Sequence, residues 1–546
     1  MSENHKRSSA FLAASNHWGN ASKKSKIDDS PQQRDNKKNQ HDVQEIIEIT
    51  SDDELVVTPN PKVKKVSQIK LLHNPSYDHS DENKINKDTV SISNLIGTKD
   101  LDETFQFNFS VDLPFFLTFL HPDFSKKKKK LTFITGSKLL ASDEPELEFI
   151  KSKFNISEVI ADIPNRFGTH HTKMMINFFE DNTCEVVIMT SNITKLDFGG
   201  LTQMVWRSGR LNKLVNKAKP LDKGTRFQKD LISYLLKYRK ATVDSLVSKL
   251  KLYDFSPVTV ELVASAPGEY TTSSYKSEDI YGFGRLLKVL ERNNLLVDNR
   301  DGTKFYNFIA QVTSISYPYT VTKTGTSSIF SHVLCPLIFS GNQGFKPLES
   351  GADSFKAHQK NNYYKPSIIF PTVKEIAENN VGFGAGQAVH FNGSQSYIHK
   401  RQYDQNIRPY LHKWNSSGKT TLTGRELVVP HCKFYMCDNG DNWATLKWVL
   451  VGSHNLSKQA WGGFNKGNES KYSVSSYELG VLVFPDADDR LVPCYNSDTL
   501  DSSDDQPIRL PFKLPPVAYD KTDKIWENRN SHGTLRDKFG QTYNLD

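Results

Sequence analysis

The sequence predicts an α/β fold divided into two domains behind a long N-terminal tail. Three observations support this prediction. Short apolar runs bounded by turn residues alternate with helix-like segments from residue 101 onward, which is typical of α/β proteins. The chain has 546 residues, which is more than the roughly 250 to 300 that a single core supports. A short chemical pattern, His-x-Lys followed later by Asn, occurs once in each half of the folded part.

The first segment, residues 1–95, is predicted to be a disordered tail. Residues 1–100 contain only three aromatic residues, Phe11, Trp18 and Tyr77, and their acidic and basic side chains balance. A segment of this composition cannot bury enough apolar surface to fold, so its removal up to residue 90 is expected to leave catalysis intact. The formal charge of +8 then belongs to the folded part, which favours an anionic partner such as nucleic acid.

Two kinds of short signal lie in this tail. Basic clusters at residues 23–26 and 62–65 are typical of nuclear localisation signals, although such clusters are also common in disordered tails. The run Ile46, Ile47 and Ile49, followed by an acidic flank, resembles a SUMO-interaction motif that adds a strand to a partner's sheet. An accidental apolar patch is the alternative. The tail therefore predicts a nuclear protein and a candidate SUMO contact.

The folded part is divided where a strand ends in strong turn signals. The apolar run 258–264 is followed by Ser265-Ala266-Pro267-Gly268, so one domain is predicted for residues 96–266 and another for residues 267–546. Other short strands are expected at residues 131–135, 185–190 and 448–451.

Composition argues against two protein classes. No stretch of about 20 apolar residues occurs, as a membrane span requires. The opening residues also lack the basic and apolar regions of a secretory signal. The cysteines are too few and too scattered for a disulfide framework, which favours a reducing compartment. They are Cys184, Cys335, Cys432, Cys437 and Cys494.

A repeated constellation carries the chemistry. Each copy places His-x-Lys before an apolar strand, a turn and a second apolar strand that ends in Asn. The two copies are His171, Lys173 and Asn192, and His431, Lys433 and Asn455. Residues two apart in a strand face the same side, so each copy projects an imidazole and an ammonium group together.

The residue types in this constellation suit an oxyanion such as phosphate. If the two copies face one another, two histidines flank one phosphate. One neutral imidazole can then attack phosphorus, while the other, protonated, gives its proton to the leaving oxygen. The lysines and asparagines supply the charge stabilisation, so neither a metal nor another cofactor is expected.

Two other interpretations of these residues are weaker. A single His-x-Lys often arises by chance, but two copies, each followed by Asn at a similar distance, rarely do. A zinc site would use His431, Cys432, Cys437 and His454. Adjacent residues in a strand point to opposite faces, so His431 and Cys432 would not bind one ion together.

The motifs resemble those of the phospholipase D superfamily, whose members carry a duplicated His-x-Lys followed by Asn. Within that superfamily the chain is most similar to the tyrosyl-DNA phosphodiesterase family, from about residue 100 to the end. The similarity rests on residues 167–175, 230–235, 455–462 and 476–482. It implies two similar α/β/α sandwich domains related by a pseudo-twofold axis, with the active site between them.

The resemblance also implies a role for each motif residue. His171 is expected to be the nucleophile and His431 the proton donor and acceptor. The phosphate ligands would be Lys173, Lys433, Asn192 and Asn455. Gln203 and Glu478 match the family residues that orient the two imidazoles. Ser457 and Phe167 are expected to contact the phosphate and a base of single-stranded DNA.

The implied reaction is hydrolysis of the bond between a tyrosine of a stalled topoisomerase I and a DNA 3′-phosphate, by way of a phosphohistidine. Other 3′ adducts are expected substrates as well. The chain is accordingly expected to be a nuclear, monomeric DNA repair enzyme that needs no cofactor and no membrane.

Two alternative functions stay open at this point. A lipid-cleaving phospholipase D typically carries Asp five residues after each motif Lys, and the chain has Phe178 in the first copy but Asp438 in the second. No amphipathic anchor helix or lipidation signal supports that alternative. A catalytically idle phosphate-binding scaffold is disfavoured because both histidines and both lysines are intact.

Overall fold

The computed structural model describes residues 65–545 except 76–85, 140–144, 215–222, 275–276, 324, 342–344, 419, 421, 466–467, 487 and 502–504. The tail motifs at residues 23–26, 46–54 and 62–64 lie outside the described residues. Residues from Lys65 onward form a single compact unit. Among the described residues, no helix is both long and apolar enough to cross a membrane.

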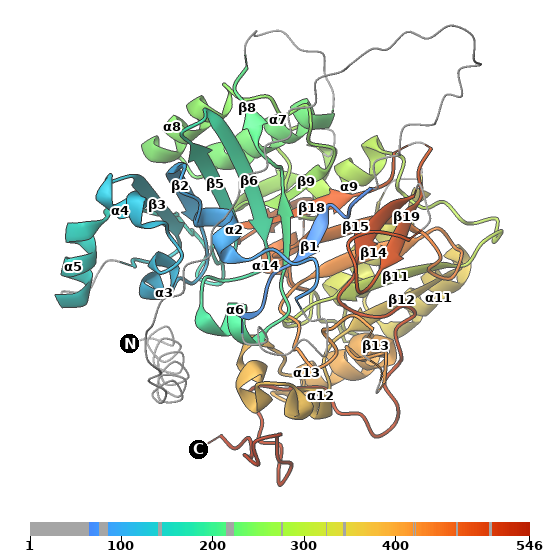
Figure 1. The fold of residues 1–546 in the computed structure, drawn as a ribbon. Coiled ribbons are helices and arrows are strands. Elements are labelled where there is room, and N and C mark those ends of the chain that lie inside the picture. The colour runs from blue at the N-terminus through green and yellow to red at the C-terminus, as the bar shows by residue number, and fades with distance from the viewer. Residues whose placement is uncertain are drawn as a thin grey trace, which may run out of the picture. The chain divides into compact units, whose positions relative to one another are not determined.

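The first half of the folded part is built on an eight-stranded mixed sheet (Figure 1). Its central strands are antiparallel and its β2-β3-β4 edge is parallel. In spatial order its strands are β1 (Ile69–Leu71), β7 (Met204–Arg207), β6 (Thr183–Met189), β5 (Met174–Phe179), β2 (Leu101–Phe107), β3 (Lys130–Thr135) and β4 (Asn155–Ile160), while β8 (Leu211–Asn212) pairs with β6.

The second half is built on a nine-stranded sheet with the same plan. In spatial order its strands are β9 (Glu261–Ser265), β18 (Glu478–Val483), β15 (Leu446–Gly452), β14 (Phe434–Asp438), β11 (Tyr306–Gln311), β12 (Tyr364–Ile369) and β13 (Leu411–His412), with β19 (Leu491–Cys494) and β20 (Gln506–Arg509) beyond β15. A separate three-stranded sheet joins β10 (Gly268–Thr271), β17 (Asn468–Val474) and β16 (Gly463–Asn465).

The two large sheets correspond strand by strand. In spatial order, each sheet has four successive antiparallel pairs of neighbouring strands, followed by two parallel pairs. The hairpin β5-β6 of the first sheet therefore matches the hairpin β14-β15 of the second. This internal duplication agrees with the repeated constellation, and the α/β fold class is confirmed.

Helices cover both faces of the first sheet. Alternate residues of β5 point to opposite faces, so Met174 and Ile176 join one hydrophobic cluster and Met175 joins another. The helices of this half are α2 (Ile92–Ile96), α3 (Leu113–Leu117), α4 (Pro122–Lys126), α5 (Pro145–Lys153), α6 (Lys195–Gly200), α7 (Lys223–Leu236) and α8 (Ala241–Leu250). Helices α2, α3 and α4 pack on one face, and α7 and α8 pack on the other.

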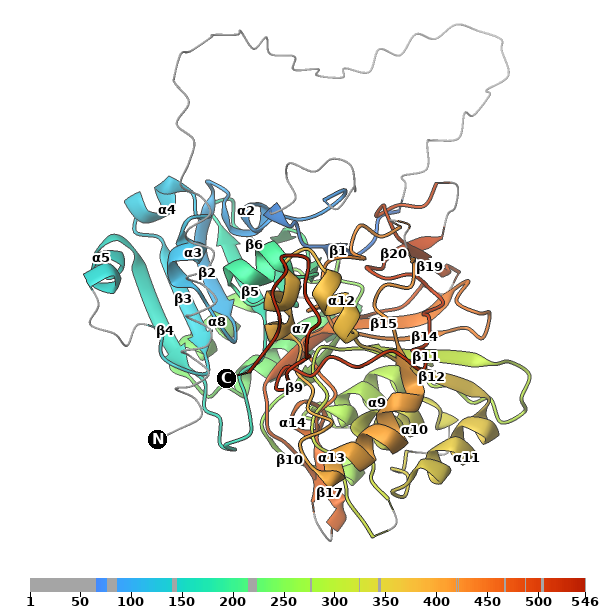
Figure 2. The same ribbon diagram turned by 90° about the horizontal axis from the view of Figure 1, so that it is seen from below.

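The core continues from α7 and α8 into the second sheet. Phe227 of α7 packs on Trp206 of β7 at a ring distance of 5.2 Å, and α7 also contacts β9. Figure 2 shows the strands of the two halves from below. The remaining helices are α9 (Phe283–Arg292), α10 (Cys335–Ile338), α11 (Ala352–Asn362), α12 (Val373–Glu378), α13 (Tyr397–Gln402) and α14 (Lys458–Trp461), with short 3₁₀ or π segments at η3 (Thr272–Ser274), η4 (Phe330–Leu334), η6 (Gly382–Ala388), η7 (Tyr403–Ile407) and η8 (Arg408–Tyr410).

Two predicted boundaries differ from the structure. Residues 69–71 form β1, which pairs with β7, so the folded part begins well before residue 96. Strand β9 belongs to the second sheet, so that sheet begins at Glu261 rather than after residue 266. The two differences concern the same position in the fold, since β1 and β9 are the equivalent first strands of the two repeats.

The segment around β1 also joins the two repeats. Ser67 donates its backbone N–H to Asp498 O at 2.8 Å, and Lys70 Nζ lies 2.9 Å from Asp498 Oδ2. Asp498 also pairs with the buried Arg509 of β20. Residues 65–75 are therefore part of the folded unit, and the prediction that residues 1–90 can be removed with catalysis intact is revised to residues 1–64.

Two truncations separate the tail from this segment. Removing residues 1–64 is expected to leave the melting temperature and activity unchanged. Removing residues 1–95 also removes buried Ile69, Leu71, Leu72, Ile92 and Leu95, each of which contributes about 1.5–3 kcal/mol on burial. Their sum is comparable to the whole stability of an ordinary domain, roughly 5–15 kcal/mol, so this variant is expected to be insoluble or to lose cooperative thermal unfolding. Equal melting temperatures for the two truncations would contradict this account.

Candidate active site

The two predicted motifs lie at equivalent places in the two sheets. His171 and Lys173 directly precede β5, and Asn192 follows β6, its antiparallel neighbour. The ladder continues past the strand ends, since the Met189 N–H donates to Lys173 O at 3.0 Å. In the second sheet the Gly452 N–H likewise donates to Lys433 O at 3.3 Å. Each Asn is thereby brought back beside its own His-x-Lys segment.

Backbone hydrogen bonds tie each motif to the other repeat. The N–H of His171 donates to Tyr477 O at 2.9 Å, and the N–H of His431 donates to Thr202 O at 2.9 Å. The residues that follow these two acceptors are Glu478 and Gln203. Each histidine is therefore aligned with a polar partner from the opposite repeat, and the site lies where the repeats meet.

Glu478 holds the first histidine. Its Oε2 lies 2.8 Å from His171 Nδ1 and also accepts a hydrogen bond from the Ser453 hydroxyl. A carboxylate on Nδ1 keeps the proton there and leaves the lone pair of the imidazole on Nε2.

Asp197 holds the second histidine, together with Gln203. Asp197 Oδ1 and Gln203 Nε2 each lie 3.0 Å from His431 Nδ1, and Gln203 Nε2 donates to Asp197 Oδ1 at 2.9 Å. Because the Gln203 amide nitrogen is a donor, the carboxylate is the group that can accept the imidazole proton. Asp197 was not predicted from the sequence.

The two motif lysines are deeply buried near one another. Lys173 Nζ donates to His171 O at 3.0 Å, and Lys433 Nζ donates to His431 O at 2.6 Å. Loss of solvation and the charge of Lys433 lower the pKa of Lys173 to about 7. Loss of solvation lowers the pKa of Lys433 to about 8. An anion bound beside the two lysines would offset this effect, because it stabilises their protonated forms and raises the pKa of each amine.

Burial sets the protonation of the two histidines. Loss of solvation lowers the pKa of His171 despite the nearby Glu478. The same effect, added to the charge of Lys433, lowers the pKa of His431 to about 3. Although burial opposes it, interaction with its histidine lowers the pKa of Glu478, and likewise that of Asp197. The site without substrate therefore holds two neutral imidazoles, each beside an ionised carboxylate.

The two asparagines are not equivalent. Asn455 Oδ1 accepts from the backbone N–H groups of Thr313 and Ser314 at 3.2 and 3.0 Å, which leaves its NH₂ group as the donor for a ligand. Asn192 instead directs its NH₂ group to Asp197 at 3.3 Å, and its Oδ1 is buried with no hydrogen-bond partner in the described residues. In this arrangement Asn192 supports Asp197.

Of the two predicted DNA contacts, Phe167 is exposed and Ser457 is half-buried. Ser457 accepts the Ala460 N–H at 3.1 Å and so caps α14, with its hydroxyl proton still available. Phe167 is 61% exposed, with the Arg166 guanidinium 4.6 Å from its ring centroid. Phe109, which the sequence did not single out, lies 5.5 Å from the His171 ring and 5.6 Å from Lys173 Nζ.

The zinc alternative finds no supporting geometry in the described part of the chain. No group of three or more His, Cys, Asp or Glu residues there is arranged to hold a metal ion. Cys432 and Cys437 have separate partners, Gln311 Oε1 at 3.3 Å and Asp438 O at 3.4 Å. His454 instead lies 3.2 Å from the Ser265 hydroxyl and stacks on Trp461.

Comparisons with known proteins agree with this geometry. The tyrosyl-DNA phosphodiesterase family model matches residues 69–520, beginning where β1 begins. A probable tyrosyl-DNA phosphodiesterase of Schizosaccharomyces pombe is 27% identical over 517 residues, covering 80% of this chain and 88% of that protein. Tyrosyl-DNA phosphodiesterase 1 of Saccharomyces cerevisiae is 26% identical over 489 residues, covering 84% and 83%. The crystal structure of the yeast enzyme superposes with a TM-score of 0.64 at 23% identity, covering 84% of this chain and 98% of that one, and shows the same fold.

Proposed function

The chain belongs to the tyrosyl-DNA phosphodiesterase family, and from that premise we propose that it hydrolyses the bond between a tyrosine and a DNA 3′-phosphate. The chain is thus a phosphodiester hydrolase. The natural substrate in this proposal is the 3′ remnant of a stalled topoisomerase I, and other 3′ adducts enter the same site. A nuclear location, a monomeric state and a SUMO contact through Ile46, Ile47 and Ile49 belong to the proposal as well.

One observation carries the proposal. His171 and His431 come from different repeats, and each has a carboxylate at Nδ1, which leaves its Nε2 available to a ligand. The buried Lys173 and Lys433 lie between the same two repeats. A phosphodiester held by the lysines meets one imidazole on each side, as a two-step displacement at phosphorus requires.

In the first step, His171 Nε2 attacks phosphorus and forms a P–N bond. The bond from phosphorus to the tyrosine oxygen breaks, and its electron pair leaves with that oxygen, which takes a proton from His431. Because His431 is neutral in the free site, it takes up this proton when the negatively charged phosphodiester binds and raises its pKa. Throughout this step, the protonated Nδ1 of His171 remains hydrogen-bonded to Glu478.

In the second step, water attacks the phosphohistidine. His431 accepts a proton from the water, a new P–O bond forms and the P–N bond breaks, which returns His171 and leaves a DNA 3′-phosphate. Asp197 stabilises the imidazolium that forms on His431, as the third member of a catalytic triad does for its histidine. The ammonium groups of Lys173 and Lys433 neutralise the equatorial oxygens and the Asn455 NH₂ group donates a hydrogen bond to them, so the proposal includes no metal.

The test is turnover of a 3′-phosphotyrosyl oligonucleotide in EDTA, followed on a denaturing gel. We expect the same rate with EDTA and with Mg²⁺, because lysine ammonium groups provide the charge that a metal would supply. A matched 5′-phosphotyrosyl oligonucleotide and phosphatidylcholine vesicles are the substrate controls. Loss of activity in EDTA that Mg²⁺ or Zn²⁺ restores would contradict metal independence. Cleavage of the vesicles alone would contradict the DNA substrate.

A further inference from the structure

We propose that Tyr317 stacks on a base of the DNA strand whose 3′-phosphate lies in the site. In this proposal Tyr317 and Phe167 are the two ends of an aromatic track beside α14. This inference rests on the proposed function and says how the strand is held. Sequence-tolerant binding of single strands generally combines exposed aromatic rings with nearby positive charge.

The segment that carries Tyr317 is fixed to the phosphate-binding loop. Thr313 and Ser314 hold the Asn455 side chain, and Ile315 forms a parallel bridge with Leu456. The Ser316 N–H then donates to Leu456 O at 3.1 Å. Since an extended chain advances about 3.3 Å per residue, Tyr317 lies on the order of 10 Å from the residue that orients Asn455. That distance suits a base near the scissile phosphate.

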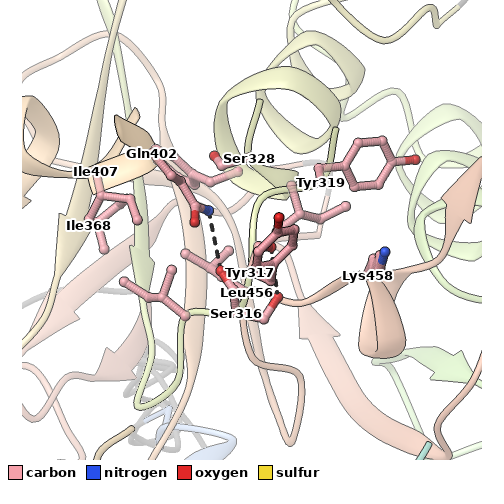
Figure 3. A pocket seen from close by; sticks show the side chains of 12 residues that line it. Ser316, Tyr317, Tyr319, Ser328, Ile368, Gln402, Ile407, Leu456 and Lys458 are labelled. Atoms are coloured by element: carbon pink, nitrogen blue, oxygen red, sulfur yellow. Dashed lines mark hydrogen bonds between the residues drawn. The ribbon is translucent and has the colours of Figure 1, made fainter. Parts of the chain in front are cut away.

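A pocket opens beside this segment (Figure 3). Its lining includes Ser316, Tyr317, Gln402, Leu456 and Lys458. Gln402 of α13 donates to Ser316 O at 3.2 Å, which fixes the segment on one side. The lining residues Leu456 and Lys458 are the sequence neighbours of Asn455 and Ser457, so the pocket lies beside the phosphate-binding loop. Its rim carries an aromatic ring, Tyr317, and an ammonium group, Lys458.

Tyr317 is the exposed ring of this rim. Its side chain is 45% exposed, and it meets the His399 ring edge to face at 4.9 Å. His399 is in turn held by the Ser396 hydroxyl at 2.8 Å from its Nδ1. A ring that is supported from one side and open on another is preorganised for stacking.

Positive charge around the rim favours nucleic acid over an apolar peptide. Lys458 lines the pocket and is exposed, whereas Lys400 of α13 is exposed but lies 3.1 Å from Asp404 Oδ2. Arg401 donates to Thr322 O at 3.3 Å and to Lys323 O at 3.1 Å, so α13 stays packed on the loop that follows Tyr317. Phosphates of a strand that stacks on Tyr317 would lie near these cations.

The other end of the track is Phe167. Its loop is joined to α14, because Thr169 donates to the Ser476 hydroxyl at 3.1 Å and the Ser476 N–H donates to Gln459 O at 3.1 Å. Tyr317 is linked to the start of the same helix because its neighbour Ser316 donates its backbone N–H to Leu456 O, just before α14. The two exposed rings therefore flank α14 from different repeats.

The first experiment is steady-state kinetics of Tyr317→Ala on a 3′-phosphotyrosyl oligonucleotide. We expect KM to rise roughly 5- to 100-fold with kcat little changed, since stacking holds the strand and takes no part in bond breaking. Tyr317→Phe should retain the wild-type KM, because the ring remains. Phe305→Ala is the matched control, because Phe305 is 55% exposed just before β11, at the end of the strand away from the site.

An abasic substrate makes the test specific. Oligonucleotides that lack one base, at successive positions from the 3′ end, are compared with wild type and Tyr317→Ala. At the position that stacks on Tyr317, the missing base should raise the wild-type KM as much as Tyr317→Ala does, and the two changes together should add nothing further.

Three outcomes would overturn the inference. The first is additive effects at every position, and the second is an unchanged KM for Tyr317→Ala. The third is a KM change that follows the length of the peptide rather than that of the DNA, which would assign the rim to the leaving group. Failure of the proposed function is distinguishable, because the wild-type protein would then turn over none of these oligonucleotides.

Discussion

Replacing His171 with alanine is expected to lower turnover of a 3′-phosphotyrosyl oligonucleotide by about 10⁴- to 10⁶-fold, the range seen when a nucleophile is removed. His171 is the imidazole whose Nδ1 is held by Glu478, which leaves Nε2 as the attacking atom. Single-turnover gels measure both the rate and any enzyme joined to DNA. No joined species should form with this variant at any time.

The matched control is His121→Ala, because His121 is a partly exposed histidine next to α4. That variant should keep wild-type rates. A melting temperature close to wild type for His171→Ala would show that the loss is chemical. Wild-type burst amplitude in His171→Ala would contradict the assignment of the nucleophile.

Replacing His431 with asparagine is expected to trap an enzyme–DNA adduct. The first step needs little protonation, because a phenol with a pKa near roughly 10 leaves as a phenolate. The second step needs a base to activate water, and the Asp197–His431 pair supplies it. The adduct should therefore form at a near-normal rate and hydrolyse slowly, giving a slowly migrating band on a denaturing gel.

The double variant His171→Ala with His431→Asn is the control for this trap. It keeps every phosphate ligand and lacks the nucleophile, so the band should be absent. A double variant that still forms the band would show that a different side chain attacks phosphorus. Product release at the wild-type rate by His431→Asn alone would remove His431 from the second step.

Local sequence pattern was enough to predict which motif residues gather at the candidate site. The period of a strand places His171 beside Lys173 and His431 beside Lys433, and antiparallel pairing returns each Asn to its motif. Those relations depend on a few neighbouring residues. The pairing of each histidine with a residue of the other repeat depends on the tertiary bridges at Tyr477 and Thr202, which spacing alone does not encode.

Asp197 escaped prediction for a local reason. Thr194 caps α6, and the Thr-x-x-Asp spacing is that of an ordinary helix start in which Asp only supports the cap. The side chain does accept the Thr194 hydroxyl at 2.7 Å, but it also reaches His431. The equivalent helix α14 has Ala460 at the matching position, so comparison of the repeats did not reveal it.

Strand β1 escaped prediction because it is short and lies in a polar, charged segment. Three residues, Ile69 to Leu71, give no measurable alternation. Their burial depends on β7 and on the contacts of Asp498, more than 400 residues later in the chain. Phe109, whose ring lies beside His171, was not singled out because an aromatic residue after a strand is usually part of a core.

Mass spectrometric mapping of the adduct trapped by His431→Asn tests the central claim most directly. The account predicts a phosphorus–nitrogen bond to His171, lost when the sample is acidified, with the DNA attached through its 3′ end. Within the peptide that contains Lys173 and Met174, the added mass of the 3′-phosphoryl group should map to His171 alone. A phosphoryl group on Lys173, on His170 or on any residue outside this motif would contradict the mechanism.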